Sequence, residues 1–430
     1  MTYSERVRQL LASSKASEGD TVELRTTDKQ YTGILMPHHD FSHPDVIVIK
    51  LKSGYNIGVM VDERTSLEVR SPAQRRAAKP LAASSGSDLP TLSFLGTGGT
   101  IASYVDYRTG AVHPALKAEE LVGTVPELSE ICRMRSKVVF SIFSENMNVQ
   151  TWRELADSVA EELNSGVEGV IVPHGTDTLG YTAAALSFML GDLPRPVVLV
   201  GAQRSSDRPS SDSYGNLLSA ARFCVKADAA EVFVLMHGET SDTCAHLHRG
   251  TKVRKMHSSR RDAFHSLNAS PVATVDLQGG MQVLSPVHRK GAGKVAPDTR
   301  MEPDVALMQF YPGMPPSLVE KVGEQLKGLV VAGTGLGHVS KEVVRTLRGM
   351  VSQGKPVVMT TQCLGGRVNL NVYDTGRDLL SAGVIPGEDM LPETALVKLM
   401  WVLGRTNDME EVRKLMLNDL RGEISERREL

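Results

Sequence analysis

Two short segments rich in glycine and threonine most constrain how this chain can fold: Thr97-Gly98-Gly99-Thr100 and His174-Gly175-Thr176-Asp177-Thr178. Each follows an apolar run, at residues 93–95 and 169–172 respectively. Apolar runs bounded by Gly and Pro are typical of buried strands in a parallel sheet. Because ligands of open α/β sheets bind beyond the carboxyl ends of the strands, we expect the threonine hydroxyls of both segments to face one crevice.

Composition excludes several classes of protein. The 430-residue chain has a net charge of -2, 41% hydrophobic and 23% charged residues, and four scattered cysteines. A net charge close to zero argues against a chain that binds nucleic acid by itself, because contacts with phosphate groups need a surplus of Lys and Arg. Cysteines without CxxC spacing predict neither a metal site nor a disulfide framework, and favour a cytoplasmic location. No apolar stretch reaches the roughly 18 residues of a membrane span, so no membrane partner is expected.

The chain divides at residues 71–90, where Ala, Ser, Pro and basic residues without apolar periodicity predict a linker. Residues 1–70 contain a helical pattern over 5–14 and then short alternating strands, which predict a small all-β barrel of the SH3-like or Sm-like type. Residues 1–80 hold 12 Lys+Arg against 10 Asp+Glu, counted along the sequence. This balance favours a docking module or spacer over an RNA-binding surface.

After residue 90, apolar runs alternate with amphipathic helical patterns, which predicts an α/β fold with a parallel sheet covered on both faces. We predict a first lobe over residues 91–296 and a second lobe over 297–430, with residues 277–295 as the hinge. The predicted helices cover residues 152–163, 181–190 and 216–225, and the predicted strands cover 196–200, 232–236, 329–331 and 356–360. A second α/β unit begins near residues 304–310.

The chemistry that these segments offer is nucleophilic. The first lacks the third glycine of a dinucleotide fingerprint and no P-loop lysine follows it, so nucleotide binding is disfavoured. Its glycines would let the backbone approach a small substrate closely and leave Thr100 exposed as a nucleophile. The alternative interpretation is a strand-to-loop turn with no catalytic role. In the second segment, Asp177 needs a cation to activate Thr176, and N–H groups after Gly175 suit an oxyanion. Helix capping by Asp177 is the alternative there.

The two segments, in this order, resemble those of the L-asparaginase family, which are two-lobed amidohydrolases with paired threonine nucleophiles. Residues 144–147, 200–204 and 212–216 extend the resemblance, which covers about residues 91–420. It implies a doubly wound α/β fold in two asparaginase-like lobes. It also implies that Thr100 attacks the side-chain amide and that Thr176, Asp177 and Lys255 form a second triad. Lys252 is the local alternative to Lys255, and a lysine ammonium beside Asp177 would favour the ionised carboxylate.

The same resemblance assigns substrate-binding residues and leaves one position open. It implies that Ser144 and Glu145 hold the carboxylate and amine of the amino-acid substrate, with Gly99 and Gly175 beside it. Asn148 suits a helix N-cap better than Ser144 does. The family places a tyrosine on the loop after the first threonine segment. Here His113 stands near that place, and Tyr104 and Tyr107 are the alternatives.

The barrel and linker ahead of the lobes, with residues 49–58, 106–110 and 361–366, resemble one branch of this family, the D subunits of archaeal glutamyl-tRNA(Gln) amidotransferases. That resemblance implies a glutaminase that passes ammonia to an E subunit. The E subunit would bind tRNA(Gln) and use ATP with Mg²⁺ to convert Glu-tRNA(Gln) to Gln-tRNA(Gln), so no cofactor is expected in this chain. A homodimeric core within a heterotetramer is also implied. The alternatives are a free L-asparaginase and a non-catalytic RNA-binding scaffold.

Overall fold

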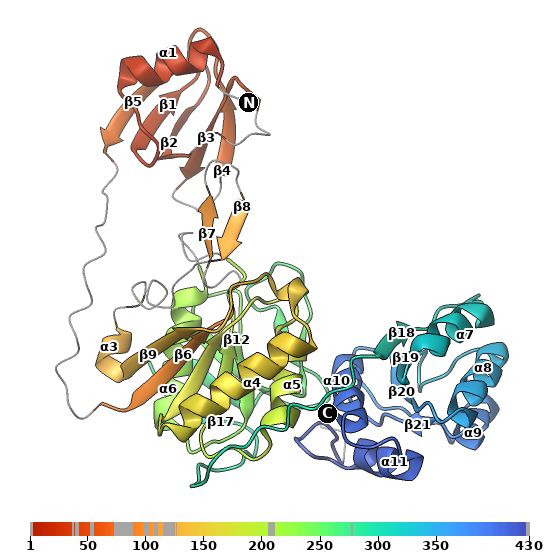
Figure 1. Cartoon of the computed structure of the whole chain (residues 1–430). Helices are drawn as coiled ribbons and strands as arrows, with labels where there is room; N and C mark the ends of the chain where they lie inside the picture. The colour runs from red at the N-terminus through yellow and green to blue at the C-terminus, as the bar shows by residue number, and fades with distance from the viewer. Residues whose placement is uncertain are drawn as a thin grey trace.

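The computed structural model describes residues 3–36, 38, 43–51, 56–72, 89–98, 103–106, 111–114, 125, 127–204, 211–276 and 278–426. Three bodies follow one another along the chain: a small N-terminal unit, an N-terminal lobe and a C-terminal lobe (Figure 1). Gly99, Thr100 and Tyr107, predicted above to serve the site, lie outside the described residues. Tyr104 and His113 lie on the paired strands β7 (Ser103–Asp106) and β8 (Ala111–Pro114), and their side chains also lie outside the description.

The N-terminal unit consists of a helix and an antiparallel sheet. Helix α1 (Glu5–Ser14) begins at Ser4, whose hydroxyl accepts a hydrogen bond from the backbone N–H of Val7. The five-stranded sheet has the order β4-β3-β2-β1-β5. Alternate strand residues such as Val22, Leu24, Ile47 and Ile49 point inward and pack with Val7. The strands are β1 (Thr21–Arg25), β2 (Gln30–Leu35), β3 (Val46–Leu51), β4 (Asn56–Met60) and β5 (Ser66–Ser71). The predicted helix and small all-β unit are confirmed.

Deletion of residues 1–80 is expected to leave a folded two-lobed protein, because the described apolar cluster of the N-terminal unit contains only residues 3–69. Circular dichroism of the truncated chain should show one cooperative thermal transition within a few degrees of that of the lobes in the full-length chain. A truncated chain without cooperative unfolding would show that the N-terminal unit is part of the core of the lobes.

The N-terminal lobe is built on an eight-stranded sheet of order β17-β16-β13-β12-β11-β10-β6-β9. The strands from β9 to β12 run parallel, as predicted, whereas β13, β16 and β17 add an antiparallel edge that the sequence pattern did not predict. These strands are β6 (Thr91–Gly96), β9 (Arg133–Val138), β10 (Gly169–Pro173), β11 (Val197–Val200), β12 (Val232–His237), β13 (Cys244–Arg249), β16 (Ala273–Asp276) and β17 (Met281–Val283). Strand β17 lies within the segment predicted as a hinge, so part of that segment belongs to the sheet.

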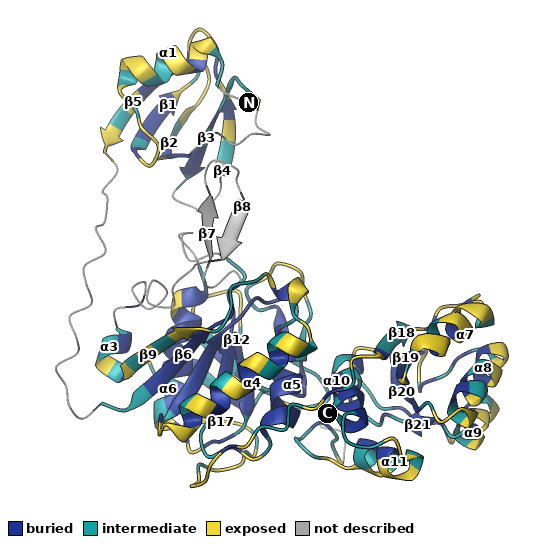
Figure 2. Cartoon of the chain, viewed as in Figure 1, coloured by how far each residue is buried: buried dark blue, intermediate teal, exposed yellow. Residues whose placement is uncertain are grey.

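Helices cover both faces of this sheet, and the central strands are therefore buried throughout (Figure 2). Val170 and Val172 of β10 pack with α4 and α5, whereas Ile171 between them packs on the opposite face with α6. Helix α4 begins with a capping box of Asn148 and Thr151, which places its apolar face on the sheet. The helices are α3 (Leu128–Ile131), α4 (Val149–Asn164), α5 (Leu179–Leu190) and α6 (Ser213–Lys226).

The C-terminal lobe contains a parallel four-stranded sheet of order β18-β19-β20-β21. Helix α10 packs against both α5 and β19, so the two lobes share one apolar core. The elements are β18 (Val305–Gln309), α7 (Pro316–Gln325), β19 (Gly328–Gly333), α8 (Lys341–Ser352), β20 (Val357–Thr361), α9 (Asp374–Ser381), β21 (Ile385–Pro386), α10 (Pro392–Leu403) and α11 (Met409–Leu417). Among the described residues, no helix is long and apolar enough to span a membrane.

Candidate active site

The two glycine–threonine segments meet at a topological switch point of the large sheet. Along the chain, the described strands of this sheet run in the order β6, β9, β10. Strand β9 pairs with one edge of β6 and β10 pairs with the other. Ligand sites of open α/β sheets form at such a point, beyond the carboxyl ends of the strands. Thr97 follows β6, and its hydroxyl donates to the carbonyl of Pro173 at the end of β10, 2.9 Å away. The two predicted segments therefore begin side by side.

Three of the four residues predicted to be catalytic are in contact. Lys255 Nζ lies 2.8 Å from Thr176 Oγ1 and 2.7 Å from Asp177 Oδ1. Thr176 is buried, and the side chain of Lys255 is 14% exposed against 67% for Asp177. The lysine is held at the end of β14 (Val253–Lys255), where it pairs with Phe264 of β15 (Phe264–Ser266). A neutral lysine amine at this distance can take the proton of the threonine hydroxyl or of a water bound there, while Asp177 orients the amine.

The geometry also decides between the alternatives left open for this triad. Lys252 is 1% exposed and its Nζ lies 2.7 Å from Asp389 Oδ2 of the C-terminal lobe, so Lys255 is the lysine that contacts Thr176. Burial lowers the pKa of Lys252 although Asp389 opposes this effect. Asp177 does not cap helix α5, which begins after Thr178 without a side-chain cap. Its carboxylate is engaged by Lys255 instead.

Ser144 and Gly175, both predicted to bind substrate, lie against each other. Ser144 begins the short 3₁₀ helix η2 (Ser144–Asn146), is buried, and accepts a hydrogen bond at its carbonyl from the Thr178 hydroxyl, 2.7 Å away. A Cβ at position 175 would lie 2.7 Å from Ser144 Cβ, so only glycine allows this approach. Glu145 is exposed beside them. The structure thus brings this loop to the triad, and the binding roles of these residues stay predictions.

The loop after β11 also contacts the triad, and its residues were not predicted as site residues. A Cβ at Gly201 would lie 2.8 Å from Thr176 Cγ2. Asp212, fully buried, accepts hydrogen bonds from the backbone N–H groups of Gln203 and Arg204, and Asn216 donates to the carbonyl of Gly201 at 2.9 Å. The sequence signal for this support is a small residue directly after a third apolar strand, which is a weak signal on its own.

His174 is a buried histidine within the second threonine segment, and its low pKa makes it a weak base. Its ring is fully buried, and its Nδ1 lies 2.7 Å from the carbonyl of Gly175. Burial lowers the pKa of His174 to about 4, and the contact with Gly175 only partly offsets this effect. The ring therefore stays neutral near pH 7 and shapes the segment instead of carrying protons.

Comparison with known proteins identifies the family. Residues 91–287 match the family "Asparaginase, N-terminal", residues 304–416 match "Glutaminase/Asparaginase C-terminal domain", and residues 16–69 match "GatD N-terminal domain". The chain is 52% identical over 428 residues to the D subunit of glutamyl-tRNA(Gln) amidotransferase from Pyrococcus furiosus, and the match covers 98% of each chain. The chain belongs to the family of glutamyl-tRNA(Gln) amidotransferase D subunits.

Further relatives and solved structures agree with this assignment. The D subunit of Thermococcus kodakarensis is 51% identical, with 95% of this chain and 94% of that one covered. The thermostable L-asparaginase of Thermococcus kodakarensis superposes with a TM-score of 0.69 at 34% identity, covering 78% of this chain and 99% of that one. L-asparaginase I of Vibrio cholerae superposes with a TM-score of 0.68 at 29% sequence identity, and the match covers 78% of this chain and 99% of that one. The predicted asparaginase-like α/β fold and the predicted branch of the family are both confirmed, whereas the exact domain boundaries stay predictions.

Proposed function

We propose that this chain is the glutaminase subunit of a tRNA-dependent amidotransferase. It hydrolyses glutamine and supplies ammonia for the conversion of Glu-tRNA(Gln) to Gln-tRNA(Gln). The contact of Lys255 with both Thr176 and Asp177 carries this proposal. It is supported by the 52% identity to the D subunit of Pyrococcus furiosus over nearly the whole chain.

The chemistry is acyl transfer by threonine. The hydroxyl oxygen of Thr100 adds to the amide carbon of glutamine, the C–N bond breaks, and the nitrogen leaves as ammonia with an added proton. Water then cleaves the acyl-enzyme and glutamate is released. Thr176, with Lys255 as proton acceptor and Asp177 as the group that orients it, assists the attacking oxygen. Ser144 and Glu145, beside Gly175, bind the α-carboxylate and α-amine of glutamine, and a carboxylate suits an ammonium partner.

The remaining steps belong to a partner. An E subunit binds tRNA(Gln) and uses ATP with Mg²⁺ to activate the glutamyl group, and this chain needs no cofactor of its own. The sequence supports this division of labour, because 48 Lys+Arg against 50 Asp+Glu leave no surplus of positive charge for tRNA. Two copies of the chain form the core of the assembly. A sequestered path between subunits keeps ammonia from protonation in bulk water.

The decisive experiment measures ammonia release from glutamine and from asparagine, first with the purified chain and then with an E subunit, ATP, Mg²⁺ and Glu-tRNA(Gln). Feeble glutamine turnover that rises by about tenfold or more with the partner and its tRNA supports the proposal. Rapid asparagine hydrolysis without a partner would make the chain a free asparaginase, in line with its structural likeness to those enzymes.

A further inference from the structure

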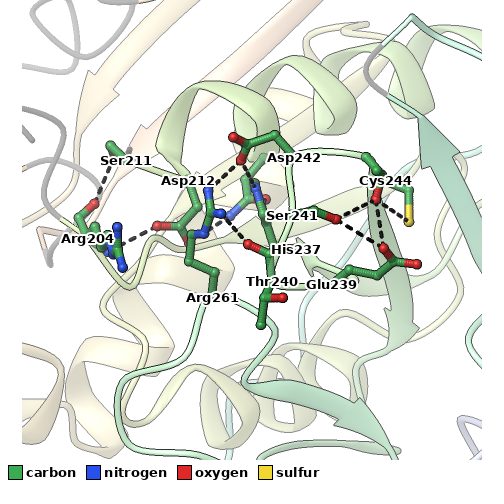
Figure 3. A network of polar contacts seen from close by, with 12 residues as sticks. Arg204, Ser211, Asp212, His237, Glu239, Thr240, Ser241, Asp242, Cys244 and Arg261 are labelled. Atoms are coloured by element: carbon green, nitrogen blue, oxygen red, sulfur yellow. Dashed lines mark hydrogen bonds and ion pairs between the residues drawn. The ribbon is translucent and has the colours of Figure 1, made fainter. Parts of the chain in front are cut away.

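A buried histidine lies at the centre of a polar network next to the triad. His237 is the last residue of β12 and is 2% exposed. Its Nδ1 lies 2.7 Å from Asn216 Oδ1, and its Nε2 lies 3.1 Å from Asp242 Oδ1. Figure 3 shows the ring of His237 next to Asp242 and Arg261. Both nitrogens of the ring therefore lie against side-chain oxygens.

The orientation of the Asn216 amide is fixed by its other neighbours. Its Nδ2 lies 2.9 Å from the carbonyl oxygen of Gly201 and 3.4 Å from Asp212 Oδ2, and both of these atoms are acceptors. A flipped amide would bring oxygen against oxygen at both contacts. Because a neutral imidazole carries only one N–H, only the imidazolium form of His237 can donate to Asn216 and to Asp242 together.

The surrounding charges favour that form. Asp242 also accepts a hydrogen bond from Arg261 Nη1. Burial raises the pKa of Asp242, but the hydrogen bond from His237 and the charge of Arg261 outweigh it, so the pKa of this carboxyl lies below its usual value. Asp242 is therefore ionised across the neutral range, which leaves His237 as the donor in their contact. The other titratable groups around the ring are Asp212 behind Asn216, Glu239 directed at Ser241 and Thr243, and His246 packed against Gly238.

The network joins the two segments that position the triad. On one side, Asn216 holds the carbonyl of Gly201, whose α-carbon packs against the methyl group of Thr176. On the other side, Asp242 holds Arg261, which also donates to the carbonyl of Thr240. Arg261 lies on the connection between β14, which ends at Lys255, and β15. His237 is thus the link between the neighbour of the threonine and the segment that follows the lysine.

We propose that His237, as an imidazolium, is a positioning residue that sets the relative placement of Thr176 and Lys255 in the glutaminase reaction. This inference rests on the proposed function. A ring with a single N–H would place a nitrogen lone pair against an oxygen at one of its two contacts. Loss of either contact is therefore expected to lower the rate of the glutaminase reaction.

Two measurements on the full chain test this. Long-range ¹H–¹⁵N spectra of ¹⁵N-histidine-labelled protein, with the ring assigned by its absence in His237→Gln, report the protonation state without reference to activity. We expect an imidazolium at the pH of maximal activity. Glutamine kinetics should show kcat lowered by at least about tenfold in His237→Gln with KM within about twofold, since a small misplacement of catalytic groups lowers rate more than binding.

Asp242→Asn is the second variant, because this exposed carboxylate can be neutralised without disturbing the core. Exchange of the carboxylate for an amide weakens the contacts of Asp242 with Nε2 of His237 and with Arg261, so kcat should fall while KM stays within about twofold. The matched control is His246→Gln, which changes the histidine opposite Met236 on the neighbouring strand and outside the network. It should leave kcat unchanged.

The outcomes separate this inference from the proposed function. A neutral His237 ring at the pH of maximal activity, or a wild-type kcat in His237→Gln, would overturn the positioning role. An equal loss of kcat in His246→Gln would overturn it too, since general packing would then explain the effect. If the wild-type chain releases no ammonia from glutamine with or without its partner, the proposed function fails. The ring spectra would still report whether the imidazolium exists.

Discussion

Replacement of Thr176 by valine is expected to lower kcat for ammonia release from glutamine by at least about 10³-fold while the fold stays intact. The substitution exchanges the hydroxyl for a methyl group of similar size, so the packing of the side chain against Gly201 is preserved. What is lost is the oxygen that lies 2.8 Å from Lys255 Nζ. Without this oxygen, Lys255 loses the hydroxyl through which it assists the attack by Thr100, so proton transfer at that position is lost.

Steady-state kinetics and thermal unfolding of the same preparation check this expectation. The unfolding midpoint should move by no more than a few degrees, because only one hydrogen bond to a charged group is removed. Thr178→Val is the matched control: its hydroxyl donates to the carbonyl of Ser144 and does not contact Lys255. It should retain far more activity than Thr176→Val. Wild-type turnover in Thr176→Val would remove this residue from the mechanism.

The sequence predicted that the two threonine segments lie close together because the signals for each are local. Each threonine segment follows an apolar strand directly, and parallel strands bring their carboxyl ends to one edge, so a pattern along the chain became proximity in space. The choice between Lys252 and Lys255 was harder. The two residues are three positions apart on one segment, and only the pairing of Lys255 with Phe264 fixes which side chain reaches Thr176.

Features that depend on contacts between residues far apart in the chain could not be predicted from the sequence. The antiparallel edge of β13, β16 and β17 has apolar runs too short to distinguish from loop or parallel strand. The network around His237 joins residues from β12, α6 and two loops, and nothing in their spacing shows that they meet. Likewise, the shared core of the lobes arises because α10 packs on α5, more than 200 residues earlier in the chain.

That shared core surrounds a buried ion pair between the lobes, which leads to the second large effect. Lys252 and Asp389 are 1% and 6% exposed at the side chain, and their charged atoms lie 2.7 Å apart. Asp389 also accepts a hydrogen bond from the backbone N–H of Ser425 at 2.9 Å. We expect Lys252→Met to lower the free energy of unfolding by about 3 kcal/mol, because the buried carboxylate loses the cation in direct contact with it and keeps the more distant Arg367, whose Nη2 lies 3.8 Å from Oδ1. Urea denaturation of both proteins measures this difference.

The second substitution Asp389→Asn, added to Lys252→Met, should recover part of that loss, since the buried charge that has lost Lys252 is then gone while the amide oxygen can still accept from Ser425. Lys137→Met is the control for a surface ion pair. Lys137 and Glu161 lie 2.8 Å apart but are 45% and 69% exposed at the side chain. Water screens such a pair, so the expected loss is much smaller than that of Lys252→Met. Equal losses in Lys252→Met and Lys137→Met would mean that the contact between the lobes does not depend on this charge. A double variant less stable than Lys252→Met would show that the charge of Asp389 still stabilises the protein without Lys252, through Arg367, whose Nη2 lies 3.8 Å from Oδ1.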